Sequence, residues 1–224
     1  MVRQLRLSLR RPVSYARREF GRGPSNAQAM AALDAWPAWH GGCLVLVGAE
    51  GIGKTHLAMG WAAQAGALIL DRRATDASAA NGRPVLMEDV DRGVDPETLF
   101  HLINMAGHDG GSLLLTARLA PAAWPAELPD LRSRLNALPV ALIEEPDDEV
   151  LEAVLRKFFR ERSIRPPKEV FPYLLRRMER SIPAAREIVR KLDEIADEEQ
   201  RPISRALARQ ILEDDTDNLD LFDG

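Results

Sequence analysis

The residues most able to do chemistry lie in one run, Gly48-Ala49-Glu50-Gly51-Ile52-Gly53-Lys54-Thr55, which matches the pattern G-x4-G-K-[ST]. The glycines let backbone N–H groups approach a phosphate chain, and a helix that opens at Gly53 directs the positive end of its dipole to the same place. Lys54 adds positive charge near the β- and γ-phosphates, and the Thr55 hydroxyl can ligate Mg²⁺. We therefore predict a site for ADP or ATP with Mg²⁺, formed by Gly48, Glu50, Gly51, Ile52, Gly53, Lys54, Thr55 and His56.

Carboxylates follow a later apolar run. Val85-Leu86-Met87 predicts a strand that ends in Glu88 and Asp89, with Asp91 two residues on. Carboxylates at a strand tip beside a phosphate loop can hold Mg²⁺ or orient an attacking water. We assign Glu88 to Mg²⁺ together with Thr55, and both Glu88 and Asp89 to the catalytic set. The usual order is Asp and then Glu, so this reversal predicts weak hydrolysis; strand-end acids that merely face solvent are the alternative.

Two further residues complete the predicted catalytic set. Thr116 ends the apolar run 113–115 and can contact a γ-phosphate or its water. Arg134 lies in Leu131-Arg132-Ser133-Arg134-Leu135, and an arginine near the end of a helix on a domain rim can reach a neighbouring molecule's nucleotide as an arginine finger. In a chain with 26 arginines, the alternative is a solvated surface residue.

Short apolar runs alternate with helical stretches from residue 43 to 143, and this alternation predicts a parallel α/β sheet. The runs are continuously apolar, which is typical of strands covered on both faces. The predicted strands are Cys43–Gly48, Ala67–Asp71, Pro84–Val90, Ser112–Ala117 and Leu138–Ile143. The predicted helices between them are Lys54–Ala65, Pro96–Gly107 and Leu128–Asn136, and Ala74–Gly82 has room for at most one or two helical turns.

After Pro146 the pattern is that of helices alone. Asp147 can cap a helix that runs to about Arg162, and Ser204 can cap a last helix that ends near Leu212. Two more helices are expected between these, at about Glu169–Arg180 and Ile182–Glu199. We therefore predict a small all-α unit, joined to the sheet by a hinge near Glu144–Pro146.

Composition narrows the class of protein. With 224 residues, 46% apolar and 29% charged, the chain is an ordinary globular protein rather than a disordered, collagen-like or membrane one. The net charge of −4 is unevenly distributed along the chain. The basic head, residues 1–22, has seven arginines and one acidic residue, Glu19, whereas the tail, residues 213–224, has six acidic residues and no basic one. A single cysteine, Cys43, fits a reducing compartment, and no apolar run reaches the roughly 18–20 residues that span a bilayer. We expect a cytoplasmic protein; the arginine-rich start also has the composition of a mitochondrial transit peptide.

The phosphate loop, Met87-Glu88-Asp89, Thr116, the Arg132-Ser133-Arg134 box and the helical end together resemble the AAA+ core of the replication initiator DnaA, over about residues 13–212. The resemblance implies a AAA+ α/β domain with a five-stranded parallel sheet at residues 13–145, a helical lid domain at 146–213 and an acidic tail at 214–224. It also implies that Tyr15, Phe20 and Asn26 pack against the adenine. In the lid, proline or alanine occupies the place where the family has an arginine that senses the nucleotide. The nearest arginines are Arg180 and Arg186, and we assign Arg186 to the nucleotide.

Because the chain ends just after the predicted lid, it is most similar to the Hda family of DnaA homologues, which inactivate the initiator. That likeness implies docking on the polymerase sliding clamp (beta subunit), stimulation of ATP hydrolysis by DnaA, and weak or no ATPase of the chain's own. The head, residues 1–12, contains Gln4-Leu5-Arg6-Leu7-Ser8-Leu9, which resembles the family's clamp-binding peptide. Its expected contacts are Gln4, Leu5, Leu7 and Leu9, and Asn218–Phe222 resembles the same motif at the other end.

Two other functions fit the same motifs. One is a helicase-loader-like AAA+ ATPase stimulated by DNA; the other is a structural adaptor whose nucleotide only supports the fold. The acidic balance, and the lack of a basic stripe with interleaved aromatics, argue against direct sequence-specific DNA binding. We expect no membrane partner, and a homodimer or larger homo-oligomer stays open.

Overall fold

Five parallel strands form one sheet in the order β2-β3-β4-β1-β5. The computed structural model describes residues 20–220, and side chains over residues 20–213. The strands are β1 (Cys43–Val47), β2 (Leu68–Leu70), β3 (Pro84–Met87), β4 (Ser112–Ala117) and β5 (Val140–Leu142). The predicted five-stranded parallel sheet is therefore confirmed.

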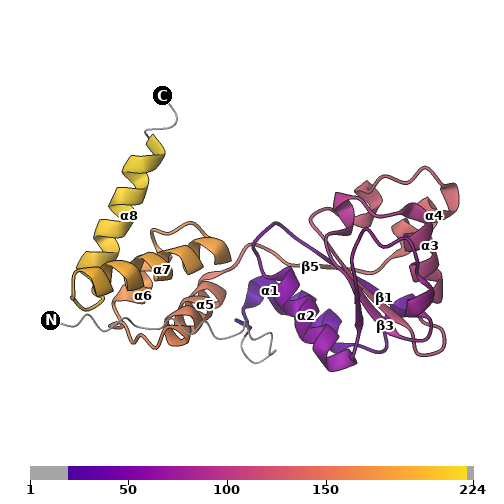
Figure 1. The fold of residues 1–224 in the computed structure, drawn as a ribbon, viewed down its shortest axis with the longest axis horizontal. Helices are drawn as coiled ribbons and strands as arrows, with labels where there is room; N and C mark the ends of the chain where they lie inside the picture. Colours follow the sequence, from indigo (N-terminus) through magenta and orange to yellow (C-terminus); the bar gives the residue numbers. More distant parts are fainter. Residues whose placement is uncertain (1–19, 221–224) are drawn as a thin grey trace, which may run out of the picture.

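Helices cover both faces of the sheet (Figure 1). One face packs on α1 (Pro24–Asp34) and α2 (Lys54–Ala65), and the other on α3 (Pro96–Met105) and α4 (Pro129–Ala137). In β1, Leu44 and Leu46 belong to the first apolar cluster and Val45 to the second, because successive strand side chains point to opposite faces. All residues of β1 and β4 are buried, as the continuous apolar runs predict.

The edge strands differ from this prediction. Ile69 in β2 is 52% exposed, and Val140 and Leu142 in β5 are 44% and 47% exposed. The expectation that these two strands are covered on both faces is wrong. The physical reason is their position: β2 and β5 end the sheet, where the helical layers no longer cover both sides.

Short 3-10 turns link these elements: η2 (His40–Gly42), η3 (Ser78–Ala80), η4 (Val90–Arg92) and η5 (Pro121–Ala123). The segment 74–82 contains only η3, in agreement with the one or two turns expected there. The turn η4 comes directly after Glu88 and Asp89, and η5 follows the end of β4. These two turns therefore shape the carboxyl edge of the sheet.

The last third of the chain is helical, as predicted: α5 (Asp148–Glu161), α6 (Val170–Leu175), α7 (Ile182–Glu198) and α8 (Arg205–Asp220). These four helices share an apolar core of their own, separate from the two sheet clusters. The Asp147 carboxylate accepts the Val150 N–H at 2.9 Å, and the Ser204 hydroxyl accepts the Leu207 N–H at 3.2 Å, so both predicted caps are confirmed. Among the described helices, none combines the length and apolarity needed to cross a membrane.

Two helix ends differ from the sequence prediction. Helix α6 stops at Leu175, well before Arg180, because Met178 turns into the helical core and Ser181 is extended as the cap of α7. Helix α8 runs past Leu212 to Asp220, and residues 205–220 contain neither glycine nor proline to stop it.

The helical unit is tied to the start of α1. The Asp147 carboxylate accepts the Ser25 N–H at 2.8 Å, and the Asp147 N–H donates to the Ser25 hydroxyl at 3.3 Å. At the end of β5, the Glu144 N–H donates to the Ser25 carbonyl at 3.0 Å. These bonds hold α5 and the rest of the helical unit beside the sheet, so that the beginning of α7 reaches the phosphate loop.

Candidate nucleotide-binding site

The predicted phosphate loop joins β1 to α2. It begins with a hydrogen bond from the Gly48 N–H to the Ala117 carbonyl (3.2 Å) and ends at Gly53, which precedes α2 with φ 101°. Only glycine adopts this φ freely. A Cβ on Gly53 would also lie 3.0 Å from the Phe20 ring, and one on Gly51 would lie 2.7 Å from Pro183. The glycines therefore serve both the turn and the close approach of neighbouring segments.

Lys54 is buried beneath this loop, with 7% of its surface exposed. Its ammonium group donates to the carbonyls of Gly48 and Ala49, both at 2.8 Å. Burial lowers the pKa of Lys54, and the carboxylates of Asp89, Asp91 and Glu50 act against this shift. A desolvated ammonium group bonded to neutral carbonyls gains most from an anion, so the geometry suits a phosphate.

Glu88 and Thr55 lie together at the mouth of the loop. Burial raises the pKa of Glu88, and the neighbouring Thr55 hydroxyl acts in the opposite direction. Among the described residues, the buried Glu88 Oε1 has no hydrogen-bond partner. A hydroxyl and a carboxylate oxygen without a partner fit Mg²⁺, which binds through few protein ligands and keeps its waters and phosphates. Residues 20–213 hold no cluster of three or more His, Cys, Asp or Glu that could enclose a metal, and the Mg²⁺ assignment stays a prediction.

The ends of β3 and β4 meet through two other predicted residues. Asp89 has a left-handed backbone, φ 53°, and its N–H donates to the Thr116 hydroxyl at 3.0 Å. Thr116 is 1% exposed. The structure thus brings the predicted Asp89 and Thr116 together at the ends of two neighbouring strands.

Sequence reasoning missed two arginines at this place. Arg92 in η4 donates to the Glu50 carboxylate at 2.9 Å and lies 3.9 Å from Asp89, so it joins the phosphate loop to the end of β3. Arg118 follows β4, and its N–H and Nε donate to Asp91 at 3.1 and 3.4 Å. The sequence feature that could have identified them is their position, because Arg92 comes three residues after Asp89 and Arg118 two residues after Thr116. We call residues 48–55, 88–92 and 116–118 together the phosphate-loop edge.

Phe20 and His56, which we assigned to the adenine and the nucleotide, lie next to each other beside Gly53 of the phosphate loop; their roles stay predictions. Their ring centroids are 5.4 Å apart, and both line a small solvent-open hollow next to α2. Asn26 has a different role: its amide donates to the Gly21 carbonyl at 2.7 Å, and its Oδ1 accepts the Gly23 N–H at 3.2 Å. It holds the turn that carries Phe20 and is 3% exposed.

Other predicted residues are not gathered at this edge. The Arg134 guanidinium is exposed on α4 and lies 4.9 Å from the centre of the Phe100 ring on α3. In the lid, Arg186 lies over Phe158 at 4.6 Å, and Arg180 binds Asp148 at 2.8 Å. Their proposed roles stay predictions.

The remaining predicted contacts lie outside the described part of the chain. These are the adenine residue Tyr15 and the clamp-binding residues Gln4, Leu5, Leu7 and Leu9. For the rival motif at 218–222, the structure describes only the backbone of α8 as far as Asp220.

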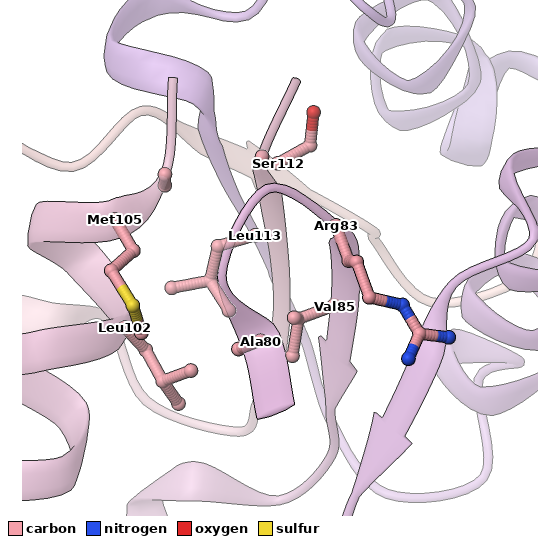
Figure 2. Close-up of a pocket in the computed structure, with 9 residues that line it drawn as sticks. Ala80, Arg83, Val85, Leu102, Met105, Ser112 and Leu113 are labelled. Atoms are coloured by element: carbon pink, nitrogen blue, oxygen red, sulfur yellow. The ribbon is translucent and has the colours of Figure 1, made fainter. Parts of the chain in front are cut away.

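A second small hollow lies at the opposite, amino end of β3 and β4 (Figure 2). Leu102, Met105 and Leu113 line it, and its only polar side chains are Arg83 and Ser112. Figure 2 shows Arg83 extending away from the apolar side chains. This hollow lacks the converging charges of the phosphate-loop edge.

Comparison with known proteins places these features in a known fold. Domain III of DnaA from Thermotoga maritima superposes with a TM-score of 0.73 at 21% identity, covering 91% of this chain and 98% of that one. AMPPCP-bound DnaA from Aquifex aeolicus gives a TM-score of 0.68 at 19% identity, covering 94% and 72%. In sequence, DnaA of Thermomicrobium roseum is 28% identical over 116 residues, which are 52% of this chain and 25% of that protein. The match thus spans about a quarter of that relative.

No protein-family model matches the chain. The fold nevertheless agrees over nearly all of domain III, and the sequence match is to the same protein. The chain therefore has the AAA+ fold of DnaA domain III and is similar to DnaA in sequence over about half of its length.

Proposed function

We propose that this chain is a nucleotide-bound, Hda-like negative regulator of replication initiation, which docks on the sliding clamp and stimulates ATP hydrolysis by DnaA in trans. The observation that carries the proposal is the position of Arg134. Its guanidinium is exposed on α4 and stacks on Phe100, and within residues 20–213 it has no hydrogen bond or ion pair. An arginine presented in this way is available to a second molecule.

Arg134 would enter the nucleotide site of ATP-bound DnaA and stabilise the negative charge that develops on the transferred phosphoryl group. Its planar guanidinium can donate two parallel hydrogen bonds to phosphate oxygens, which lysine cannot do. Phe100 holds the guanidinium on the surface without neutralising it, because a ring face attracts a cation but carries no net charge.

The chain's own nucleotide, ADP or ATP, would lie at the phosphate-loop edge. Lys54 and the loop N–H groups would bind the phosphates, and Phe20 and His56 would border the base. Thr55 and Glu88 would hold Mg²⁺, which neutralises phosphate charge when bound. The AMPPCP-bound DnaA of the same fold supports nucleotide binding here. With Asp89 in the water-orienting place, we expect slow turnover by the chain itself.

Clamp docking would use the head of the chain in a reducing, cytoplasmic compartment. Gln4, Leu5, Leu7 and Leu9 would enter an apolar groove of the clamp as an extended peptide, with alternate leucines facing the groove. Docking on a DNA-loaded clamp would bring Arg134 close to DnaA that is bound nearby. The sequence motif supports this part of the proposal.

The test is a reconstitution with DNA-loaded clamp, ATP-bound DnaA and the full chain, in which the conversion of DnaA-bound ATP to ADP is followed. Arg134→Ala should lower the stimulated rate by about 10³-fold, the scale of an arginine finger. Arg132→Ala is the matched control on the same helix, since Arg132 donates to the Ala122 carbonyl instead. If stimulation survives in Arg134→Ala, the trans assignment is wrong.

A second arm tests the clamp. The double variant Gln4→Ala, Leu5→Ala should abolish both clamp capture and stimulation. Stimulation that persists without clamp capture would remove docking from the proposal. Substantial turnover by the chain alone, raised by single-stranded DNA, would instead favour the helicase-loader function.

A further inference from the structure

A group of arginines surrounds one buried tyrosine in the helical unit. Tyr173 on α6 is 3% exposed, and the Arg177 guanidinium lies over its ring, at 4.6 Å from the centre. Arg205, the first residue of α8, lies over the same ring at 5.3 Å. Arg209 follows one turn later on the same side of α8. We call Arg177, Arg205 and Arg209 the lid arginine cluster.

This cluster is exposed and only partly neutralised. The side chains of Arg177 and Arg205 make no hydrogen bond or salt bridge with any described residue, whereas Arg209 donates to Glu213 at 2.7 Å. The tyrosine ring attracts the two guanidinium groups but carries no net charge, so it holds them in place without neutralising them. The cluster therefore offers two uncompensated positive charges to a partner.

Both ends of α8 carry charges that oppose its dipole. Arg205 begins the helix, and the first turn contains no acidic residue. At the other end, residues 214–220 contain four aspartates, and the last turn contains no basic residue. The start of a helix carries partial positive charge and its end carries partial negative charge, so both groups disfavour an isolated α8. A segment of opposite charge beside each end would make both placements favourable.

The charge that the cluster lacks is present in the far half of α8. Residues 213–220, which we call the acidic half of α8, contain five acidic residues and no basic one. Within one copy the helix carries this half away from the cluster, and Figure 1 shows α8 projecting beyond α6 and α7. At a rise of about 1.5 Å per residue, Asp214 lies about 13 Å and Asp220 about 22 Å along the helix from Arg205. These aspartates are therefore out of reach of Arg205 in their own copy, whereas those of a second copy can reach it.

We propose that the lid arginine cluster binds the acidic half of α8 from a second copy of this chain, with the two helices antiparallel. Each copy supplies one basic and one acidic surface, so the contact is reciprocal and closes as a two-fold dimer. The arginines of one helix then lie at the negative end of the other, which relieves the unfavourable charges at both helix ends. This surface is distinct from the phosphate-loop edge and from Arg134.

The experiment follows the oligomeric state of the full chain by analytical ultracentrifugation over a range of protein concentrations. The native chain should dimerise at low ionic strength, and the dimer should weaken as salt screens the charges. The double variant Arg177→Glu, Arg205→Glu should raise the dimer dissociation constant by about 10-fold or more, because like charges then face each other. The control is Arg160→Glu, Arg165→Glu, which reverses two exposed arginines of the helical unit outside the cluster and should change the constant by less than about twofold.

An exchange of charges makes the test specific for antiparallel pairing. The double variant Asp217→Arg, Asp220→Arg should also lose the dimer, because its two ends are both basic. When it is mixed in equal amounts with Arg177→Glu, Arg205→Glu, the two variants should form a heterodimer. In that heterodimer each of the two reciprocal contacts again joins opposite charges.

A native chain that stays monomeric at low salt would overturn the inference. So would a dimer that the arginine variant leaves unchanged, or a mixture of the two variants that does not dimerise. If the arginine variant does not fold, the aspartate variant decides, since residues 217–220 lie beyond the last members of the helical core, Ile211 and Leu212. Duplex DNA bound by a monomeric native chain, and lost in the arginine variant, would identify the cluster as a nucleic-acid surface instead.

Discussion

The phosphate-loop edge and the exposed face of α4 both carry basic residues predicted to meet a phosphate, but they are built in opposite ways. Lys54 is 7% exposed and is bonded to two loop carbonyls, while Asp91 and Thr116 beside it are almost fully buried. Arg134 is exposed, and its described contact is one aromatic ring.

The difference teaches where each group can act. A buried, pre-paired lysine cannot leave its loop, so it can bind only a ligand that enters the chain's own site. An exposed arginine on a short helix has little to align it within its own chain, so it requires a second molecule to complete its surroundings. The following predictions test this contrast.

Lys54→Ala should have the largest effect. It removes the ammonium group that now donates to the carbonyls of Gly48 and Ala49. Without this group the phosphates lose their charge-assisted hydrogen bonds, and we expect nucleotide affinity to fall by about 100-fold or more. Equilibrium binding of ADP and ATP to the purified chain measures this. Lys168→Ala, an exposed lysine of the helical unit, is the control and should bind normally.

Glu88→Gln should reduce the gain in nucleotide affinity that Mg²⁺ provides by about 10-fold, because a neutral amide is a weaker Mg²⁺ ligand than a carboxylate. Burial raises the pKa of Glu88, so it takes up a proton at a higher pH than an ordinary glutamate. Because protons compete with Mg²⁺, the gain in affinity from Mg²⁺ should shrink as the pH falls through this raised pKa. Titrations with and without Mg²⁺ across pH should lose this dependence in the Gln variant; an unchanged pH profile would contradict the assignment.

Asp147→Ala should loosen the lid and lower the free energy of unfolding by about 1 kcal/mol, the usual value of a helix cap. Partial burial by itself would raise the pKa of Asp147. Hydrogen bonds from Ser25 and from the start of α5 outweigh this effect, so that the pKa is lowered overall. Its contribution is therefore present above about pH 4 and is lost as the pH falls through the lowered pKa. Denaturant unfolding at pH 7 and pH 3 should show the difference between the two proteins shrinking at low pH.

Arg134→Ala should have the smallest effect on the chain by itself. An exposed cation on a ring contributes about 0.5–1 kcal/mol at most, so unfolding free energy and nucleotide affinity should stay near the native values. Thermal and denaturant unfolding, with nucleotide titration, measure this. A large loss of stability would mean that Arg134 is structural, and the contrast between the two regions would fail.

Much of the phosphate-loop edge was predictable because local rules specify it. The motif at 48–55 placed Gly53 at the turn and Lys54 at the start of α2, where the structure has them. Asp89 and Thr116 come together because the carboxyl ends of parallel strands meet at one edge, and both strands were predicted from apolar runs alone. Asp147 and Ser204 were found by their capping chemistry.

The missed residues depend on contacts between distant segments. Nothing local marks Arg92 as a partner of Glu50 or Arg118 as a partner of Asp91, because these pairs exist only once η4 and the end of β4 lie beside the loop. The half-exposed edge strands, and the early end of α6, likewise follow from packing rather than from propensity.

The sequence by itself determined the parallel α/β class, the phosphate loop, the strand-end carboxylates and the helical end, since each rests on periodicity or spacing along the chain. Only the tertiary structure decided that Lys54 is buried, that Pro183 of the helical unit packs on Gly51, and that Arg134 remains on the surface. The physical reason is that exposure and charge pairing are properties of neighbours in space. A sequence specifies those neighbours through the whole fold, and no short motif contains them.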